Sequence, residues 1–234
     1  AMTAAAEAGV LPPAGGEDAC AAATLLEGFG GSVLPFLSAD ALALPKLCAC
    51  FFDALSAVLA LARAPGAPPL SEELARAARH SLRHGARHRA EVSRVALEAV
   101  YALGAHAAQQ EHAPEPVCAL VAALQHELLL DLAGSQIHPD SADVAGNALL
   151  ALVVARPDAW AALVEGIAAG AAEPEALRQL FAQLTSANGV RGSLDRPNRA
   201  RFRANLALFL AAVRQRPHLA AILRTAEQGA AGAL

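Results

Sequence analysis

Histidine and arginine recur in one short stretch of the chain, RHSLRHGARHR, at residues 79–89. His80, His84 and His88 are spaced four residues apart. On one helix they would share a face, where imidazoles can ligate a divalent transition metal. Two features oppose a metal site: Gly85 is expected to end the helix before His88, and the arginines would repel a cation. We therefore predict an exposed basic face or turn, with a patch for an acidic partner or a phosphate as the alternative.

A second basic cluster lies in SLDRPNRARFRANLALFLAAVR, residues 193–214. Its apolar residues recur with the helical period and form one stripe: Phe202, Leu206, Phe209, Leu210 and Val213. Arg199 and Arg203 lie off that stripe. The stretch is therefore predicted to be an amphipathic helix that starts near Asp195–Pro197 and has a charged outer face. Direct nucleic-acid binding is not required to explain it.

Seven arginines of the two clusters are the candidate partner-binding residues: Arg76, Arg79, Arg83, Arg87, Arg196, Arg199 and Arg203. The simpler interpretation is that they form ordinary solvated helix faces. If the first cluster binds an acidic partner, replacing Arg79 and Arg83 with Glu is expected to weaken that partner without unfolding the chain.

Other stretches resemble catalytic motifs only in part. His126-Glu127 begins an H-E-x-x-H match, but Leu130 occupies the second histidine position. The glycine-rich residues 28–31 are followed by Val33 where a dinucleotide-binding loop has its last glycine. The carboxylates are scattered and form no acid–base pair. We therefore expect no catalytic residue, no cofactor and no metal site, and a protein that is not an enzyme.

Composition narrows the class of protein further. The 234 residues are 55% hydrophobic and 17% charged, with a net charge of −4, which argues against disorder and against a globally basic nucleic-acid binder. The best candidate for a membrane span, residues 47–61, is short and contains Asp53, so no membrane association is expected. The four cysteines lack the spacing of a zinc site and are expected to be free thiols inside the cell.

Good helix formers dominate the chain, and Gly or Pro interrupts them at intervals. Ser71 followed by two glutamates marks one helix start, Pro116 and Pro157 suit first turns, and Gly85 and Gly189 suit left-handed helix ends. The predicted helices span about residues 43–63, 71–84, 90–110, 115–133, 140–155, 157–170, 174–187, 197–214 and 217–228.

Successive pairs of these helices start near residues 43, 90, 140 and 174–197, loosely the period of HEAT or armadillo repeats. We therefore predict an all-α fold in which antiparallel helix pairs form a HEAT- or armadillo-like superhelix, with a single compact helical bundle as the alternative. The predicted division is a flexible or partial-repeat segment at 1–41, helical repeats at 42–229, and a disordered tail at 230–234.

Several segments between residues 45 and 214 resemble the C-terminal part of nuclear transport receptors of the exportin-4 type, in the importin-β (karyopherin) superfamily. These segments occur in the same order and at the same spacing as in those receptors. The resemblance is carried by FFDALSAVLALA (51–62), SLRHG (81–85), EVSRVALEAV (91–100) and the run from Ala145 to Arg214, which includes Leu184-Thr185-Ser186-Ala187 and Leu194-Asp195-Arg196.

The resemblance implies stacked HEAT repeats and a receptor that shuttles between nucleus and cytoplasm. It implies protein cargo, the small GTPase Ran in its GTP form, and nuclear pore proteins as partners. Receptors of this kind are several times longer than 234 residues, so the resemblance implies a C-terminal portion, and it transfers no Ran-binding or cargo-binding residue.

Two alternative functions are a HEAT scaffold unrelated to transport and an all-helical enzyme that uses the histidine cluster.

Overall fold

The computed structural model describes residues 24, 28–29, 44–61, 70–110 and 113–216. The predicted helix at 217–228, the tail at 230–234 and nearly all of segment 1–41 lie outside the described residues. Between residues 44 and 216 the described chain forms only helices, so the predicted all-α class is confirmed. The α-helices are α4 (Pro45–Leu61), α5 (Glu72–Ala86), α6 (Ala90–Ala107), α7 (Glu115–Ala133), α8 (Ala142–Ala155), α9 (Pro157–Ala169), α10 (Pro174–Ser186) and α11 (Arg196–Gln215).

Local signals explain where several of these helices begin. The Ser71 hydroxyl accepts a hydrogen bond from the Leu74 amide at 3.2 Å and caps α5. Asp195 caps α11 in the same way, because its carboxylate accepts from the Asn198 amide at 2.8 Å. Pro157 occupies the first turn of α9, where its missing N–H is not needed.

Gly85 does not end α5, and that prediction was wrong. The helix continues through Gly85 to Ala86, and a Cβ on Gly85 would lie 2.4 Å from Cζ of Phe52 in α4. The position therefore needs glycine because α4 packs so close to it. Gly189 does adopt the left-handed backbone, with φ +70°, in the 3-10 turn Ala187–Gly189 that follows α10.

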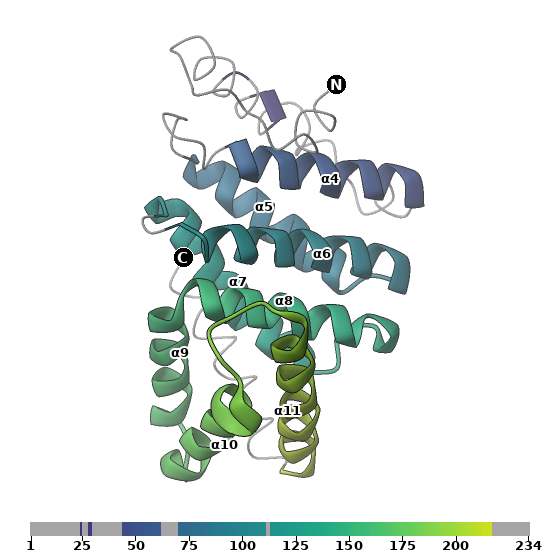
Figure 1. Ribbon diagram of the computed structural model, residues 1–234. Coiled ribbons are helices and arrows are strands. Elements are labelled where there is room, and N and C mark those ends of the chain that lie inside the picture. The colour runs from purple at the N-terminus through teal and green to yellow at the C-terminus, as the bar shows by residue number, and fades with distance from the viewer. Residues whose placement is uncertain (1–23, 25–27, 30–43, 62–69, 111–112, 217–234) are drawn as a thin grey trace.

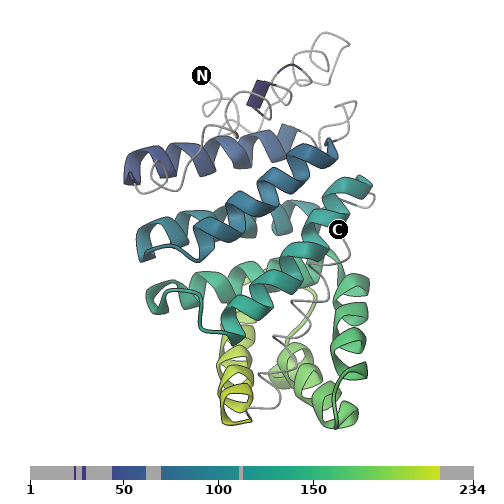
Figure 2. The same ribbon diagram turned by 180° about the vertical axis from the view of Figure 1, so that it is seen from behind.

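The helices from α4 to α8 pack in two rows (Figures 1 and 2). In the first row, α6 packs against both α4 and α8. In the second row, α5 packs against α7, and the rows meet where α5 contacts α6 and α7 contacts α8. The expected pairing of residues 43–63 with 71–84 is not the main contact there, since α4 packs chiefly against α6. Each helix in a row therefore packs against the next helix but one along the chain.

The stack changes direction after α8. The chain bends by 106° between residues Pro139–Ala155 and Pro157–Ala169, and in Figure 1 α9 runs across the direction of α8. Gln125 of α7 is buried at this bend, where its Nε2 donates to the carbonyl oxygens of Leu152 at 2.7 Å and Arg156 at 3.0 Å. The backbone amides of Arg156 and Trp160 also donate to these two carbonyls, so the Gln125 amide is a second donor that joins α7 to the end of α8.

Aromatic side chains pack between α9, α10 and α11. The ring centroids of Trp160 and Phe181 are 5.8 Å apart, and those of Phe181 and Phe209 are 5.0 Å apart. Phe202 is also fully buried on α11. The prediction that Phe202 belongs to a buried apolar stripe is thus confirmed, and the edge-on and tilted ring contacts of Trp160, Phe181 and Phe209 join α9, α10 and α11.

Helix α7, and not residues 47–61, is the best match to a membrane span in the part of the chain that the structure describes. By length and hydropathy α7 could cross a bilayer. The helical segments Pro139–Ala155 and Pro157–Ala169, taken together, also meet these length and hydropathy criteria. In the fold, 67% of the tested α7 window is buried inside the protein. A core helix has these same properties.

Candidate functional site

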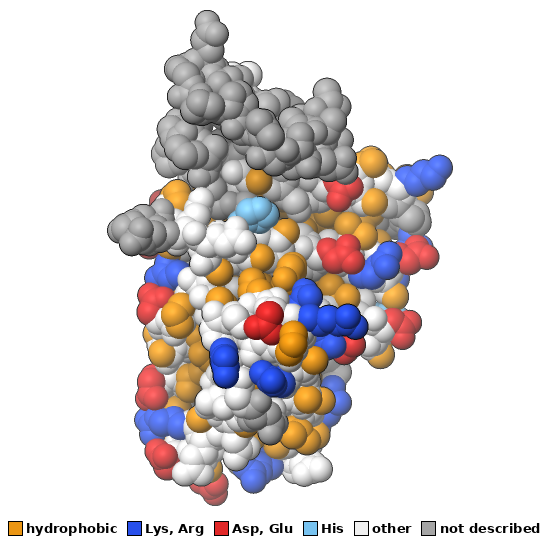
Figure 3. All heavy atoms as spheres, in the orientation of Figure 1, with side chains coloured by type: hydrophobic (Ala, Val, Ile, Leu, Met, Phe, Trp, Pro, Cys, Tyr) orange, Lys and Arg blue, Asp and Glu red, His pale blue; other side chains and the backbone are white. Residues whose placement is uncertain are grey.

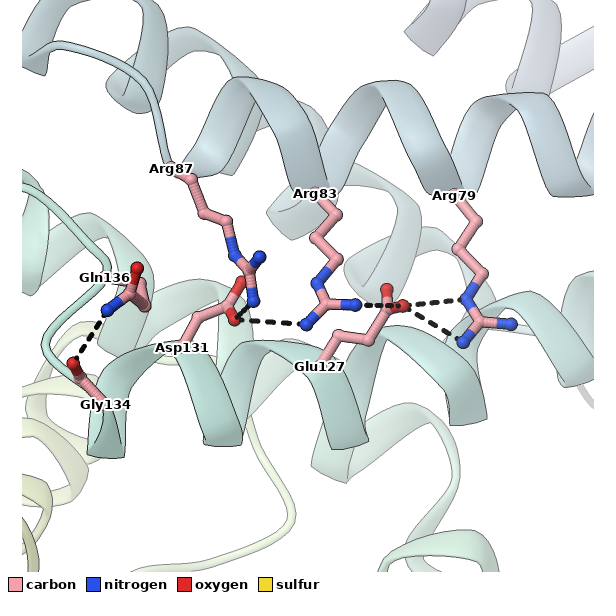
Figure 4. A network of polar contacts seen from close by, with 7 residues as sticks. All are labelled: Arg79, Arg83, Arg87, Glu127, Asp131, Gly134 and Gln136. Carbon is pink, nitrogen blue, oxygen red and sulfur yellow. Dashed lines mark hydrogen bonds and ion pairs between the residues drawn. The ribbon is translucent and has the colours of Figure 1, made fainter. Parts of the chain in front are cut away.

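The first arginine cluster lies against two carboxylates of α7, and together they form what we call the ladder: Arg79, Arg83 and Arg87 of α5 with Glu127 and Asp131 of α7 (Figure 4). Arg79 Nε and Arg83 Nη1 donate to Glu127 Oε1 at 3.0 and 3.2 Å. Arg83 Nη2 also lies 3.5 Å from Asp131 Oδ1, and Arg87 pairs with the same carboxylate. Both sets recur every four residues, so their spacing matches along two neighbouring helices.

Burial differs sharply between the two sides of the ladder. The Asp131 side chain is 2% exposed and that of Glu127 is 9%, whereas the arginine side chains keep 24–35% exposure. An ionised carboxylate is costly to bury unless it is paired, so the arginines are required to hold α7 in this position. The interpretation of these three arginines as an ordinary solvated face is therefore wrong, because the ladder is part of the packing between α5 and α7.

This pairing also changes the expected outcome of charge reversal. Glutamates in place of Arg79 and Arg83 would face the carboxylates of Glu127 and Asp131. Neighbouring like charges repel strongly where burial lowers the effective dielectric constant. The double variant is now expected to destabilise the fold. Arg76 differs from the other three, since it is exposed and forms no ion pair among the described residues.

The second cluster, on α11, is divided between packing and surface. Arg199 reaches Tyr101 of α6, with its guanidinium 5.6 Å from the ring centroid. Arg203 reaches α8, where Nη1 donates to Asn147 Oδ1 at 2.9 Å and Nε lies 3.6 Å from Asp143 Oδ1. Arg196 is exposed at the start of the helix. Of the seven predicted arginines, Arg76 and Arg196 are therefore the two that are exposed and whose side chains form no hydrogen bond or ion pair among the described residues.

The three histidines stay in line even though α5 ends at Ala86. The ring centroids of His80 and His84 are 6.4 Å apart, and those of His84 and His88 are 6.0 Å apart. Burial lowers the pKa of His84 below its ordinary value, and repulsion from His88 and His80 lowers it further. The expectation that His88 would leave the row was wrong, because the turn after Ala86 carries its ring back beside His84.

No group of three or more His, Cys, Asp or Glu among the described residues is placed to hold a metal ion. Cys48, Cys50 and Cys118 are free thiols, as predicted, and burial raises the pKa of Cys48. Cys20 lies outside the described residues. The partial H-E match leads to Glu127 of the ladder, so its carboxylate serves helix packing.

The sequence analysis did not single out Tyr101, Asp131 or the structural role of Glu127. One signal was present: the four-residue step from Glu127 to Asp131 repeats the step between the arginines of residues 79–87. Nothing in the spacing shows that these two helices are neighbours.

No protein-family model matches this chain, and no solved structure matches it significantly.

Proposed function

We propose that the chain is a protein-binding helical-repeat portion of a nuclear export receptor, with its helices arranged in the HEAT or armadillo manner. The observation that carries the proposal is the two-row packing of α4 to α8, in which α6 contacts α4 and α8 while α5 contacts α7 (Figure 2). Repeat proteins bury their apolar stripes by stacking in this way, and their extended surfaces bind other proteins.

The resemblance of residues 45–214 to exportin-type receptors supplies the transport part of the proposal. A receptor of this kind would carry protein cargo with Ran-GTP, contact nuclear pore proteins, and shuttle between nucleus and cytoplasm. Recognition would depend on many surface contacts and on charge complementarity, with no chemical step. Of the seven candidate arginines, Arg76 and Arg196 are the ones best placed for such contacts, because both are exposed and neither side chain forms an ion pair among the described residues.

A HEAT-type scaffold outside transport is the second candidate. The 106° bend after α8 favours it, because α9, α10 and α11 pack together around their own aromatic contacts and interrupt the regular stack.

The two candidates differ in their dependence on Ran. The natural protein that contains this chain is tagged at its gene, and captured from cell extract with Ran locked in the GTP form, with Ran-GDP, or with no added Ran. An export receptor is expected to retain cargo only in the Ran-GTP sample. Partners that are retained equally in all three samples would contradict the transport proposal and support a scaffold.

Surface variants then test whether this portion of the chain binds directly. Arg76→Glu and Arg196→Glu are expected to weaken capture of a directly bound acidic partner, while Arg94→Glu on α6 supplies the same charge change elsewhere. Arg94 is exposed. Equal capture by all three variants would show that neither arginine contributes to binding.

A further inference from the structure

Five arginines, which we call the basic patch, lie in the loop before α11 and in the first turns of that helix: Arg191, Arg196, Arg199, Arg201 and Arg203. Figure 3 shows Lys and Arg side chains gathered on this face of the molecule, where Figure 1 places the start of α11. Arg191, Arg196 and Arg201 are exposed, and none of them forms an ion pair among the described residues. Residues 187–203 contain one carboxylate, that of Asp195, so the basic patch carries a net positive charge in a chain whose overall charge is −4.

The carboxylate of Asp195 is already engaged in holding the start of the helix. Its Oδ2 accepts a hydrogen bond from the Ser193 hydroxyl at 2.6 Å, and its Oδ1 accepts from the Asn198 amide at 2.8 Å. These two hydrogen bonds lower the pKa of Asp195, and the nearby charges of Arg201 and Arg191 lower it further. Asp195 therefore offsets one of the five positive charges and leaves the others available to a partner.

The loop that carries Arg191 is held in place by buried groups. Asn198 is 1% exposed, and its Nδ2 donates to the carbonyl oxygens of Arg191 at 2.7 Å and Ser193 at 2.5 Å. The Asn198 Oδ1 accepts from the Arg191 amide at 2.8 Å, so this one side chain binds the loop backbone three times. Val190 and Leu194 pack against the core on either side of these contacts. The loop therefore has little backbone freedom left to lose when it binds a partner, which favours binding.

We propose that the basic patch binds an acidic segment of a partner protein, rich in glutamate and aspartate. Such binding rests on the protein-binding part of the proposed function and does not depend on Ran. Guanidinium groups bind carboxylates through charge-assisted hydrogen bonds that are often bidentate. A patch of one sign also speeds the encounter with a partner of the opposite sign and disfavours basic partners.

The aromatic residues near the basic patch favour a protein partner over a single-stranded nucleic acid. Proteins that bind single strands stack the bases on exposed aromatic rings. Phe202 and Phe209 of α11 are buried, and the Arg199 guanidinium lies over the ring of Tyr101. The basic patch therefore offers cations without rings on which bases can stack.

The proposal is tested by fluorescence anisotropy with the purified full chain and a labelled peptide of alternating glutamate and serine. A peptide of alternating glutamine and serine is the uncharged control and should not bind. Arg191→Glu and Arg201→Glu should each weaken binding of the glutamate peptide about tenfold, because each replaces an attraction with a repulsion. Arg94→Glu makes the same charge change at an exposed position of α6, outside the basic patch, and should bind the peptide as the parent does.

All three substitutions are at exposed positions, so the circular dichroism and the melting temperature should stay those of the parent, and a loss of binding is then not a loss of fold. Absence of binding by the parent, or equal weakening in Arg94→Glu and Arg201→Glu, would overturn the proposal. Tighter binding of a labelled single-stranded oligonucleotide at the same arginines would also overturn it, by assigning the basic patch to nucleic acid. The assay contains no Ran, so its failure leaves the transport proposal to the capture experiment, and Ran-independent capture leaves peptide binding unaffected.

Discussion

Arg199 of α11 binds Tyr101 of α6 across 98 residues of sequence, with its guanidinium over the ring and Nη1 3.2 Å from the phenolic oxygen. Helix α11 otherwise packs against α8, α10 and α7. The contact therefore ties the last described helix directly to the middle of the first row. Both side chains are partly buried, a setting in which a cation–π contact is stronger than it is in full solvent.

Replacing Tyr101 separates the two parts of this contact. Tyr101→Phe removes the hydrogen bond and keeps the ring, and is expected to lower the free energy of unfolding by about 0.5–1 kcal/mol. Tyr101→Leu also removes the ring face and should lower it by about 1–2 kcal/mol. Urea denaturation measures both values. In an Arg199→Met background both losses should shrink, and undiminished losses would show that the contact contributes nothing.

The ladder predicts that the two sides of one ion pair differ in their effect on stability. Replacing Arg83 and Arg87 with Met leaves Asp131 buried without these cations, and should lower the free energy of unfolding by about 3–5 kcal/mol. Asp131→Leu instead leaves partly exposed arginines that water can solvate, and should lower it by no more than about 1–2 kcal/mol.

The measurement is chemical denaturation at low and at high salt. Screening affects exposed charges much more than buried ones, so the loss in the double arginine variant should persist at high salt. If Asp131→Leu destabilised the fold as much as the double arginine variant does, the buried carboxylate would not be the controlling group.

Two glycines in helices are predicted to respond to alanine with opposite signs. A Cβ on Gly104 of α6 would lie 2.8 Å from the Ala151 carbonyl carbon and 2.9 Å from the Leu152 amide nitrogen, both in the α8 backbone. Gly104→Ala must push the two helices apart, and should lower the free energy of unfolding by about 1–3 kcal/mol. A Cβ on Gly166 of α9 meets nothing within 4 Å, so Gly166→Ala should raise it by about 0.5–1 kcal/mol through helix propensity alone.

Thermal and urea unfolding of the two variants compare the effects directly. Stabilisation by Gly104→Ala would mean that α6 and α8 are farther apart than the structure places them. A loss of stability in Gly166→Ala would mean that the outer face of α9 is covered.

The helices themselves could be predicted because their signals are local. The observed bounds of α7, Glu115–Ala133, coincide with the predicted range, and the apolar stripe from Phe202 to Val213 is buried apart from the partly exposed Leu210. A capping side chain such as Ser71 and the periodicity of apolar residues act within one or two turns of chain, so the sequence by itself determined these elements.

Contacts between helices depended on the tertiary structure. The sequence places Arg79, Arg83 and Glu127 on helices, but the 44 to 48 residues between the ladder partners carry no signal of their pairing. The same limit explains the error at Gly85: glycine is common at helix ends, and only the approach of Phe52 shows why this one lies inside α5.

The sequence alone predicted a helix boundary at Pro157, since proline disfavours a helical conformation in the residue before it. At the 106° bend itself, the contacts come from residues distant in the chain, namely Gln125 of α7 and the packing of Trp160 against Phe181. Thus the sequence determined where helices begin and end, through interactions between near neighbours. The tertiary structure alone decided which charges are buried together and which arginines remain on the surface, because burial depends on residues that are distant in the chain.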